Sequence, residues 1–330
     1  MQPKIGSPRQ SDTTAAEPVA VVIVSWNSAA FLERALTSLR GLERPVRHVV
    51  VVDNGSTDGT ASIVRERFPE VDLLECGENL GFCRANNLGF ARTDTPFVLA
   101  LNPDTELDPG FLRHLLPAFE DPAVGLACGK LLRMDRRTLD SAGQELGRSR
   151  QPLDRGYGTP DDGRFDRDET VFGACGAAAL YRRDMIDSIA DETQFFDETF
   201  FAFVEDLDVA WRARKLGWRT AYRAAAIGMH ARGGSATGAT WKRRVAAMLG
   251  RNADVRFHIA KNRYLTIIRN DSVAGYISNI PFIWARDLGT LALLLVSSPG
   301  VLLRLWKERH VFSRARAKRH LDAGRPRIQV

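Results

Sequence analysis

VAVVIVSWNSAAFLERALTSLRG, residues 19–41, reads as a strand that leads directly into a helix. The first seven residues are nearly all apolar and β-branched, which is typical of a strand buried on both faces of a parallel sheet. Asn27 or Ser28 can cap a helix with apolar residues at helical spacing, and Gly41 can end it. Such a strand–helix pair is the first half of a parallel β-α-β unit.

The same alternation continues through the first half of the chain. Further buried strands are expected at residues 48–52, 71–74, 97–101 and 124–128. Helices are expected between or after them, near residues 57–68, 82–92 and 109–119. The sequence therefore predicts an α/β fold, with a Rossmann-like, mostly parallel sheet and helices on both faces. Ligands of such sheets bind beyond the carboxyl ends of the strands, so polar residues just after each strand matter most.

The alternation weakens in the middle of the chain. Residues 133–170 are dominated by Gly, Pro, Asp and Arg, and we expect an extended, partly mobile loop region, which at this length is often a functional lid. Beyond it we expect further elements, namely a strand at 171–181, a helix at 204–216, and short strands at 219–222 and 225–229. Residues 1–18 are polar and are expected to form a disordered lead-in without a secretory signal.

Composition and charge bound the class of protein. The 330 residues are 44% hydrophobic, enough for a sizeable core, and carry a net charge of +6. A basic balance admits nucleic acid, anionic lipid or phosphate-bearing small molecules as partners. No nucleic-acid recognition motif accompanies the charge, so no nucleic-acid partner is expected. The four cysteines form no Cys-x-x-Cys pair, which favours reduced thiols in a cytosolic protein.

The last quarter has a different pattern, helical from about Thr240 onward. Its apolar stretches are interrupted at Arg286–Asp287 and again at residues 297–300. The uninterrupted piece, residues 288–296, is shorter than the ~20 residues that a spanning helix needs. A basic tail over residues 304–327 follows, which favours helices that lie on an anionic membrane surface. The alternative is a soluble helical cap with a solvated basic face.

Polar motifs follow the second and fourth expected strands. In VVDNGSTDGT, residues 51–60, Asp53 and Asn54 can accept hydrogen bonds from a nucleobase or a ribose. The alternative is that these residues only form a turn, for which their types are also well suited. Asp58 is expected to cap a helix. In LALNPDTELD, residues 99–108, Asn102 and Asp104 suit Mg²⁺ or Mn²⁺ that also binds a substrate diphosphate. The alternative for Asn-Pro-Asp is a simple turn.

Two later motifs carry candidate acid–base and metal chemistry. FVEDLDVAWR, residues 203–212, has three carboxylates at a helix start, and Asp206 suits a general base. The helix dipole alone also favours such carboxylates, so one of them can be only a cap. In GMHARGGS, residues 228–235, His230 can join Asp in a metal shell, and Gly233 to Ser235 can cradle a phosphate.

A fifth segment, ENLGFCRANNLG at residues 78–89, brings polar and small residues to the end of the third strand. They are Asn79, Gly81, Arg84 and Asn87. Arg84 is a candidate phosphate contact. The alternative is a capped helix with buried amides.

The order of VSWN, VVDNGSTDGT, NLGFCRANN, LNPD, the VEDLD helix and MHARGGS resembles the family 2 inverting glycosyltransferases of the GT-A fold. Within them the chain is similar to the bacterial rhamnosyltransferase branch that builds cell-wall and surface polysaccharides on lipid carriers. The resemblance covers about residues 19–270. It implies a GT-A catalytic domain at 19–238 and a helical, basic, membrane-associating region at 239–330, after the disordered residues 1–18.

The resemblance also implies roles for individual residues. Asn102-Pro103-Asp104 stands in for the Asp-x-Asp metal motif, which leaves Asp104 as the main ligand of Mg²⁺ or Mn²⁺, with His230 as a late metal or diphosphate contact. Asp206 is implied as the catalytic base, with Glu205 as the alternative. The implied donor contacts are Ser25, Trp26, Asn27, Asp53, Asn54, Asn79, Gly81, Arg84, Asn87 and Asn102.

The function implied is a single inverting displacement. L-rhamnose from dTDP-L-rhamnose would pass to a lipid-linked or cell-surface glycan at the cytoplasmic face of the plasma membrane, with the protein bound peripherally. The same motifs admit a UDP-sugar donor or a non-catalytic nucleotide-sugar-binding protein, and a homodimer is compatible with them. The sequence after the first strand contains no Gly-x-Gly-x-x-Gly, which speaks against a nicotinamide dehydrogenase. A processive synthase would add a Gln-x-x-Arg-Trp motif and several spanning helices.

Overall fold

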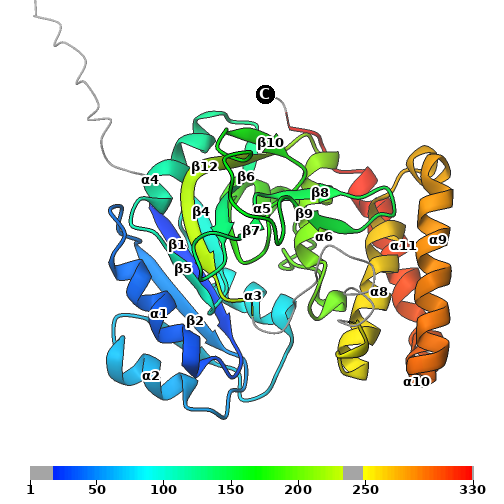
Figure 1. Ribbon diagram of the computed structural model, residues 1–330, viewed down its shortest axis with the longest axis horizontal. Coiled ribbons are helices and arrows are strands. Elements are labelled where there is room, and N and C mark those ends of the chain that lie inside the picture. The colour runs from blue at the N-terminus through cyan, green and yellow to red at the C-terminus, as the bar shows by residue number, and fades with distance from the viewer. Residues whose placement is uncertain (1–17, 233–247, 329–330) are drawn as a thin grey trace, which may run out of the picture.

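The computed structural model describes residues 18–232 and 248–328, and it confirms the α/β fold (Figure 1). The parallel part of the sheet consists of β1 (Val19–Ser25), β2 (His48–Asp53), β3 (Asp72–Glu75) and β4 (Phe97–Leu101). The helices that connect or follow these strands are α1 (Ala29–Arg40), α2 (Thr60–Arg67), α3 (Phe82–Phe90) and α4 (Phe111–Leu115). The expected alternation of strand and helix is therefore correct in this half.

The second half of the sheet mixes directions. It contains β5 (Thr105–Leu107), β6 (Val124–Leu132), β10 (Glu169–Val171), β11 (Ala178–Arg182) and β12 (Arg219–His230). The strand order is β10-β12-β6-β11-β4-β1-β2-β3, with β5 beside β12. β11 runs antiparallel between β4 and β6, whereas β12 is parallel to β6. The carboxyl ends of β1, β2, β4 and β12 therefore meet at one edge of the sheet.

Several expected boundaries were wrong. Residues 133–170 are not an extended loop, because they include β7 (Leu139–Ser141), β8 (Gln144–Leu146) and β9 (Pro152–Asp154). Strands of three residues are too short for a periodic pattern to reveal. The expected strand at 171–181 is divided between β10 and β11, and the two strands expected at 219–229 are one, β12, with a register shift between Arg223 and Ile227. The helix expected at 109–119 changes at Leu116 into the 3₁₀ helix η1 (Leu116–Glu120), which contains Pro117.

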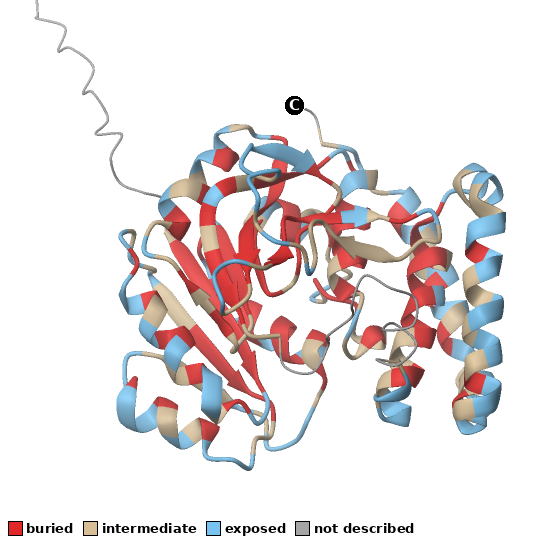
Figure 2. Cartoon of the chain, in the orientation of Figure 1, coloured by how far each residue is buried: buried red, intermediate tan, exposed pale blue. Residues whose placement is uncertain are grey.

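The core lies on both faces of the sheet, whose central strands are buried along their lengths (Figure 2). Alternate residues of one strand point to opposite faces. In β1, Val22 and Val24 join one apolar cluster, whereas Val21 and Ile23 join the other. This two-sided burial explains why the strand is almost continuously apolar.

The C-terminal region is helical, as expected. After α5 (Arg183–Ile189) and α6 (Glu205–Lys215), it comprises α8 (Ala253–Asn270), α9 (Val273–Ser297), α10 (Pro299–Lys307) and α11 (His310–Ala323). In Figure 1, α8 lies between the sheet domain and α9, which forms the outer edge of the molecule. The expected boundary between the two regions, 238/239, lies outside the described residues, as do residues 1–17 of the expected disordered segment.

Helix α9 differs from the expectation, because Arg286 and Asp287 do not interrupt it. Its 25 residues make it, among the described residues, the one helix long and apolar enough to cross a membrane by length and composition alone. Asp287 forms an ion pair with Arg263 of α8 at 2.6 Å, so the Asp287 charge is neutralised by another helix of the protein. The expectation that no apolar helix reaches spanning length was therefore wrong, although length and composition alone place no helix in a membrane.

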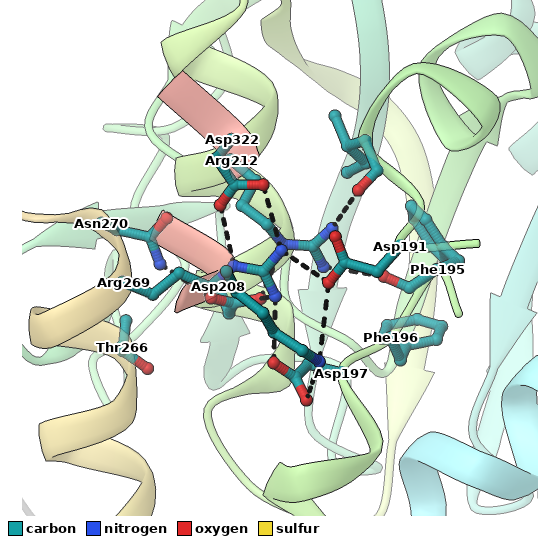
Figure 3. A network of polar contacts seen from close by, with 12 residues as sticks. Asp191, Phe195, Phe196, Asp197, Asp208, Arg212, Thr266, Arg269, Asn270 and Asp322 are labelled. Atoms are coloured by element: carbon teal, nitrogen blue, oxygen red, sulfur yellow. Dashed lines mark hydrogen bonds and ion pairs between the residues drawn. The ribbon is translucent and has the colours of Figure 1, made fainter. Parts of the chain in front are cut away.

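A buried ionic network joins the C-terminal helices to the sheet domain (Figure 3). The Arg269 guanidinium, on α8, pairs with Asp322 of α11 at 2.8 Å, with Asp197 at 3.0 Å and with Asp191 at 2.8 Å. Beside it, Asn270 donates to Asp208 of α6 at 2.7 Å. Removing one partner of a buried ion pair is strongly destabilising, so this network holds α8 and α11 firmly against the start of α6.

Candidate functional site

The donor side of the candidate site lies where β1 and β2 end. Ser25 and Asp53 are paired in register at the ends of these two strands, and both are buried. Asp53 Oδ2 accepts from the Ser56 amide at 3.3 Å. Asp53 Oδ1 and Ser25 Oγ have no hydrogen-bond partner among the described residues. Buried polar atoms without partners are costly, so these two are suited to receive a polar ligand.

The loop after β1 places Trp26 and Asn27 beside them. Trp26 is 55% exposed, so its ring face is available for stacking. Asn27 has a left-handed backbone with φ of 51°, and its side chain accepts from the Thr57 amide at 2.9 Å. Asn27 therefore braces the loop after β1 against the loop after β2. Asp58 was expected to cap the second helix; it accepts from the Thr60 amide at 3.1 Å at the start of α2, and also from the Ala29 amide at 2.9 Å at the start of α1.

Asn54 and Asn79 form a paired amide bridge. Asn54 donates to Asn79 Oδ1 at 3.0 Å and accepts from the Leu80 amide at 2.8 Å. Asn79 Oδ1 also accepts from Gly81. Gly81 has φ of 85°, and a Cβ there would lie 2.5 Å from the Phe201 ring, so this position requires glycine. These three residues shape the loop beside the donor site.

Helix α3 carries the last two residues expected on the donor side. Arg84 is exposed at the helix start, where its guanidinium is available to a phosphate. Asn87 is buried, donates to the Phe196 carbonyl at 2.8 Å and accepts from the Phe196 amide at 2.9 Å. Its amide is therefore used to hold segment 195–198, which is the alternative role that the sequence left open.

The candidate metal motif, Asn102 to Asp104, lies between β4 and β5, next to the end of β12. The Asp104 carboxylate approaches His230 Nε2 at 3.2 Å, and the backbone of Ala231 donates to the Asp104 carbonyl at 2.9 Å. His230 Nδ1 lies 2.8 Å from Asp140, at 0% side-chain exposure. Burial opposes the imidazolium, but the hydrogen bonds to Asp104 and Asp140 outweigh it and raise the pKa of His230 to about 9.

These residues fit a divalent cation of the Mg²⁺ or Mn²⁺ class. The described residues contain no cluster of three or more His, Cys, Asp or Glu arranged around a metal position. Asp104 and His230 Nε2 nevertheless face each other, and Asp140 fixes the other ring nitrogen as carboxylates do behind metal-bound histidines. Such cations are often held by one or two protein ligands, with water and substrate phosphate completing the shell. A bound cation would replace the proton on Nε2.

The candidate base is at the start of α6. Asp206 Oδ2 accepts from Gln144 Nε2 at 2.7 Å and from the Gly176 amide at 3.2 Å. Asp206 Oδ1 accepts from the Leu207 amide at 2.8 Å. Burial, followed by the charge of Asp154, raises the pKa of Asp206. A fixed carboxylate with an increased affinity for protons meets the requirements of a general base.

The other two carboxylates of the motif have different environments. Glu205 is buried, and its Oε2 has no partner among the described residues. Burial and the neighbouring Asp206 raise the pKa of Glu205 to about 8, so Glu205 is protonated at neutral pH. Asp208 pairs with Arg212 at 2.8 Å and accepts from Asn270, which is a structural role.

One segment contacts both the candidate base and the candidate metal motif. The backbone N–H of Asn102 donates to the Ala177 carbonyl at 2.9 Å. The backbone N–H of Gly176, the residue before Ala177, donates to Asp206. Segment 176–177 therefore contacts both motifs through its backbone. The expected phosphate cradle, Gly233 to Ser235, lies outside the described residues.

Sequence reasoning missed the residues that support the site. Gln144 and Asp140 lie in the region expected to be a loop, so nothing marked them as contacts of Asp206 and His230. Asn262 of α8 donates to the carbonyls of Phe200 at 3.0 Å, and of Ala202 and Phe203 at 2.7 Å. These carbonyls belong to the loop before α6, where Phe201, Phe203 and Val204 all have positive φ. Only the three-dimensional contact reveals that α8 holds this strained backbone.

Comparisons with known proteins show the family of the chain. The family model Glycosyl transferase family 2 matches residues 20–190. The chain is 34% identical over 238 residues, 64% of its length, to the N-acetylglucosaminyl-diphospho-decaprenol L-rhamnosyltransferase of Mycobacterium tuberculosis, and covers 75% of that protein. It is 30% identical to the pre-mycofactocin glycosyltransferase of the same species over 68% of its own length and 45% of that protein.

Solved structures show the same fold. The mannosyltransferase PcManGT from Pyrobaculum calidifontis, solved in complex with GDP-Man and Mn²⁺, matches 94% of this chain and 87% of its own, with a TM-score of 0.52 and 18% identity. GalNAc-T7, solved with UDP, GalNAc and Mn²⁺, matches 76% of this chain and 51% of its own, also with a TM-score of 0.52. The GT-A architecture inferred from the motifs is thereby confirmed. The chain belongs to glycosyl transferase family 2 and is a glycosyltransferase.

Proposed function

We propose that the chain is an inverting, metal-dependent glycosyltransferase that moves L-rhamnose from dTDP-L-rhamnose onto a lipid-linked glycan acceptor. The observation that carries the proposal is the joining of Asp206 to the Asn102–Asp104 motif through segment 176–177. A base and a diphosphate-binding motif at one sheet edge are what a single displacement at an anomeric carbon needs. The choice of sugar and acceptor rests on the relative at 34% identity, whose name specifies rhamnose and a diphospho-decaprenol.

The donor would occupy the edge beyond β1, β2 and β4. Asp53 Oδ1 would accept a hydrogen bond from the nucleoside, and Ser25 Oγ would donate one to it. Trp26 would stack on the base. Asn27, Asn54, Asn79 and Gly81 would keep the two loops in shape. Arg84 would contact the diphosphate, with Asn102 beside it.

Asp206 would then take the proton of the acceptor hydroxyl as that oxygen attacks the anomeric carbon. Gln144 and Gly176 hold Asp206 Oδ2 in place, so the carboxylate does not need to reorient during the reaction. Glu205 is protonated at neutral pH and is less suited to this role. Asp104 and His230 would hold Mg²⁺ or Mn²⁺, which when bound neutralises charge on the leaving nucleoside diphosphate.

Attachment to the cytoplasmic face of a membrane is part of the proposal. Helix α9 exposes large apolar side chains, and the most exposed of them are Val273, Ile277, Leu288, Leu295 and Val296. The junction of α10 and α11 adds the exposed cations Lys307, Arg309, Arg314 and Arg316. An apolar helix beside clustered basic residues is suited to anionic lipid.

The test is donor hydrolysis by the purified full chain. We expect slow release of dTDP from dTDP-L-rhamnose with Mn²⁺ or Mg²⁺, and no release with EDTA or with Asp104→Ala. UDP-N-acetylglucosamine, UDP-galactose and GDP-mannose are the comparison donors. Release from one of them instead would correct the donor and keep the reaction. If no donor is hydrolysed and none binds in a metal-dependent way, the proposed reaction is wrong.

A further inference from the structure

A pocket of about 1110 Å³ lies between the β8–β9 hairpin region and the C-terminal helices, and we call it the α9 pocket. One wall is formed by residues 151–157 with Arg164 and Phe165. The opposite wall comes from α8 and α9, and it combines the apolar or small residues Ile259, Ala285, Gly289 and Leu293 with Arg286 and Thr290. The donor contacts described above are all outside this lining.

The α9 pocket adjoins the catalytic base through two short strands. Asp154 of β9 lines the pocket and is paired in register with Gln144 of β8. Gln144 donates to Asp206 at 2.7 Å. Asp154 therefore links the lining of the pocket to Gln144, which is a contact of the candidate base.

The charges of the pocket are unbalanced toward positive. Its lining contains four arginines, Arg155, Arg164, Arg251 and Arg286, but only two carboxylates, Glu145 and Asp154. Glu145 pairs with Arg155 at 3.4 Å, and Asp154 pairs with Arg232 at 2.7 Å. Two of the arginines also have carboxylate partners outside the lining, because Arg155 pairs with Glu169 at 2.5 Å and Arg164 pairs with Asp162 at 2.9 Å.

Arg251 is the cation of this lining that is best placed to bind an anion. The half-buried Arg251 makes no ion pair with any described residue, and burial together with the nearby Arg232 lowers its pKa. A half-buried cation facing a cavity and repelled by a second cation favours a bound anion.

The combination of anion-binding and apolar surfaces in one cavity defines the ligand class. A nucleotide or a free phosphate would leave the apolar residues of α8 and α9 without a contact, and a neutral lipid would leave the arginines without one. We propose that the α9 pocket is the acceptor subsite, which takes a polyprenyl diphosphate-linked sugar with its diphosphate near Arg251 and its chain along Gly289 and Leu293. This assignment rests on the proposed function and adds the place where the second substrate binds.

Gly289 offers a direct test of the pocket. A Cβ at Gly289 meets no atom within 4 Å, so a larger side chain enters the pocket without a clash with the fold. Gly289→Phe should therefore fill the apolar wall. Gly300→Phe is the matched control, because Gly300 is an equally open glycine, on α10 and outside the pocket lining. Arg251→Gln removes the cation, and Arg47→Gln, at an exposed position before β2, is its charge-matched control.

Binding of farnesyl diphosphate to the full chain is measured by calorimetry, with pyrophosphate and farnesol as separate arms. We expect farnesyl diphosphate to bind more tightly than either fragment. Arg251→Gln should weaken binding about tenfold, and Gly289→Phe should abolish it, with both controls at wild-type affinity. Thermal unfolding of each variant checks that the fold is retained.

Three results would overturn the assignment. They are no binding of farnesyl diphosphate, equal binding by Gly289→Phe and wild type, and pyrophosphate binding as tightly as farnesyl diphosphate. The last would mean an anion site without a lipid role. Donor hydrolysis by the wild-type chain is measured separately, so a failure of the proposed reaction is distinguished from a failure of the pocket.

Discussion

Three carboxylates stand in the first turn of α6, and the structure gives each of them a different environment. Asp206 is held by Gln144 and Gly176, Glu205 is buried without a partner at one oxygen, and Asp208 is paired with Arg212. The sequence predicts that this cluster matters, because three acids in four residues are unusual outside caps and sites. It does not assign the roles, since Gln144, which contacts Asp206, and Asn270, which contacts Asp208, are each 62 positions away.

The first prediction separates Asp206 from Asp208. Asp206→Asn should lower kcat by about 10²- to 10⁴-fold, because the acceptor hydroxyl loses its base, and should leave metal-dependent donor binding unchanged. Asp208→Asn should instead lower the free energy of unfolding by about 3 kcal/mol, because Arg212 stays buried without a charged partner. Steady-state kinetics and chemical denaturation measure the two effects. Near-normal kcat in Asp206→Asn would remove Asp206 from the role of base.

The second prediction concerns pH and Glu205. Its pKa is raised in the folded protein, so the folded state keeps a proton that the unfolded state releases above about pH 4.3. The free energy of unfolding contributed by Glu205 must therefore fall as pH rises toward about 8. Glu205→Gln cannot release this proton and should be more stable than wild type, increasingly so toward alkaline pH. Denaturation at a series of pH values measures the difference, and a constant difference would contradict the assigned pKa.

At the scale of elements, α8 acts on the site without containing a candidate catalytic residue. Its Asn262 holds three carbonyls of the loop before α6, and its Lys261 donates to the Thr199 carbonyl of the same loop. Three non-glycine residues of this loop have positive φ, which costs free energy that the surrounding contacts must offset. Asn262 is therefore a positioning residue for the start of α6.

The third prediction follows from these contacts. Asn262→Ala should lower kcat by about tenfold or more with little change in the KM for the donor, because a loop that moves by about 1 Å misplaces Asp206. Its stability should fall by about 1–3 kcal/mol, since three carbonyls that are buried or partly buried lose a side-chain donor. Thr266→Val is the control: it removes the buried hydrogen bond from Thr266 Oγ1 to the Asn262 carbonyl without touching the loop. Equal kcat losses in the two variants would mean that Asn262 acts only through stability.

Elements with a long apolar run or a clear periodic pattern could be predicted from the sequence, and strands of three residues could not. β4 has the predicted bounds, because a run of five buried apolar residues is a strong signal. β7, β8 and β9 were missed, because strands of three residues carry no period and are defined by their partners. The two support residues in that region, Asp140 and Gln144, were missed with them. The motifs after long strands were thus found, and their supports on short strands were not.

At the scale of the whole molecule, the C-terminal helices have an inner side that binds the sheet domain and an outer side that is exposed. The inner side of α8 is joined to the sheet domain by the Arg269 network, whereas α9 presents apolar residues at the outer edge (Figure 1). The sequence predicts the helices and the basic tail but not this division, because the network joins Asp191, Asp197 and Asp322 across 131 positions. If α9 lies on a lipid surface, the α9 pocket opens beside that surface.

The fourth prediction is that the full chain binds vesicles containing anionic lipid. Flotation with phosphatidylglycerol vesicles should recover the protein in the lipid fraction, and about 1 M salt should weaken the interaction by screening the basic residues. Leu288→Glu and Val296→Glu should reduce recovery further, because both side chains are exposed on α9 at 63% and 88%. Leu88→Glu, on α3, is the matched control.

The pattern of losses distinguishes the two forces and the two readings of α9. A protein held only by its basic residues would float normally after the α9 substitutions and be released fully by salt. A protein held only by apolar contacts would be insensitive to salt. Equal flotation on neutral phosphatidylcholine vesicles would mean that apolar contacts alone hold the protein, whereas no flotation on either lipid would favour the soluble cap. Because the acceptor in the proposed reaction is a lipid, binding that requires both α9 and anionic lipid would place the α9 pocket at the surface from which that acceptor arrives.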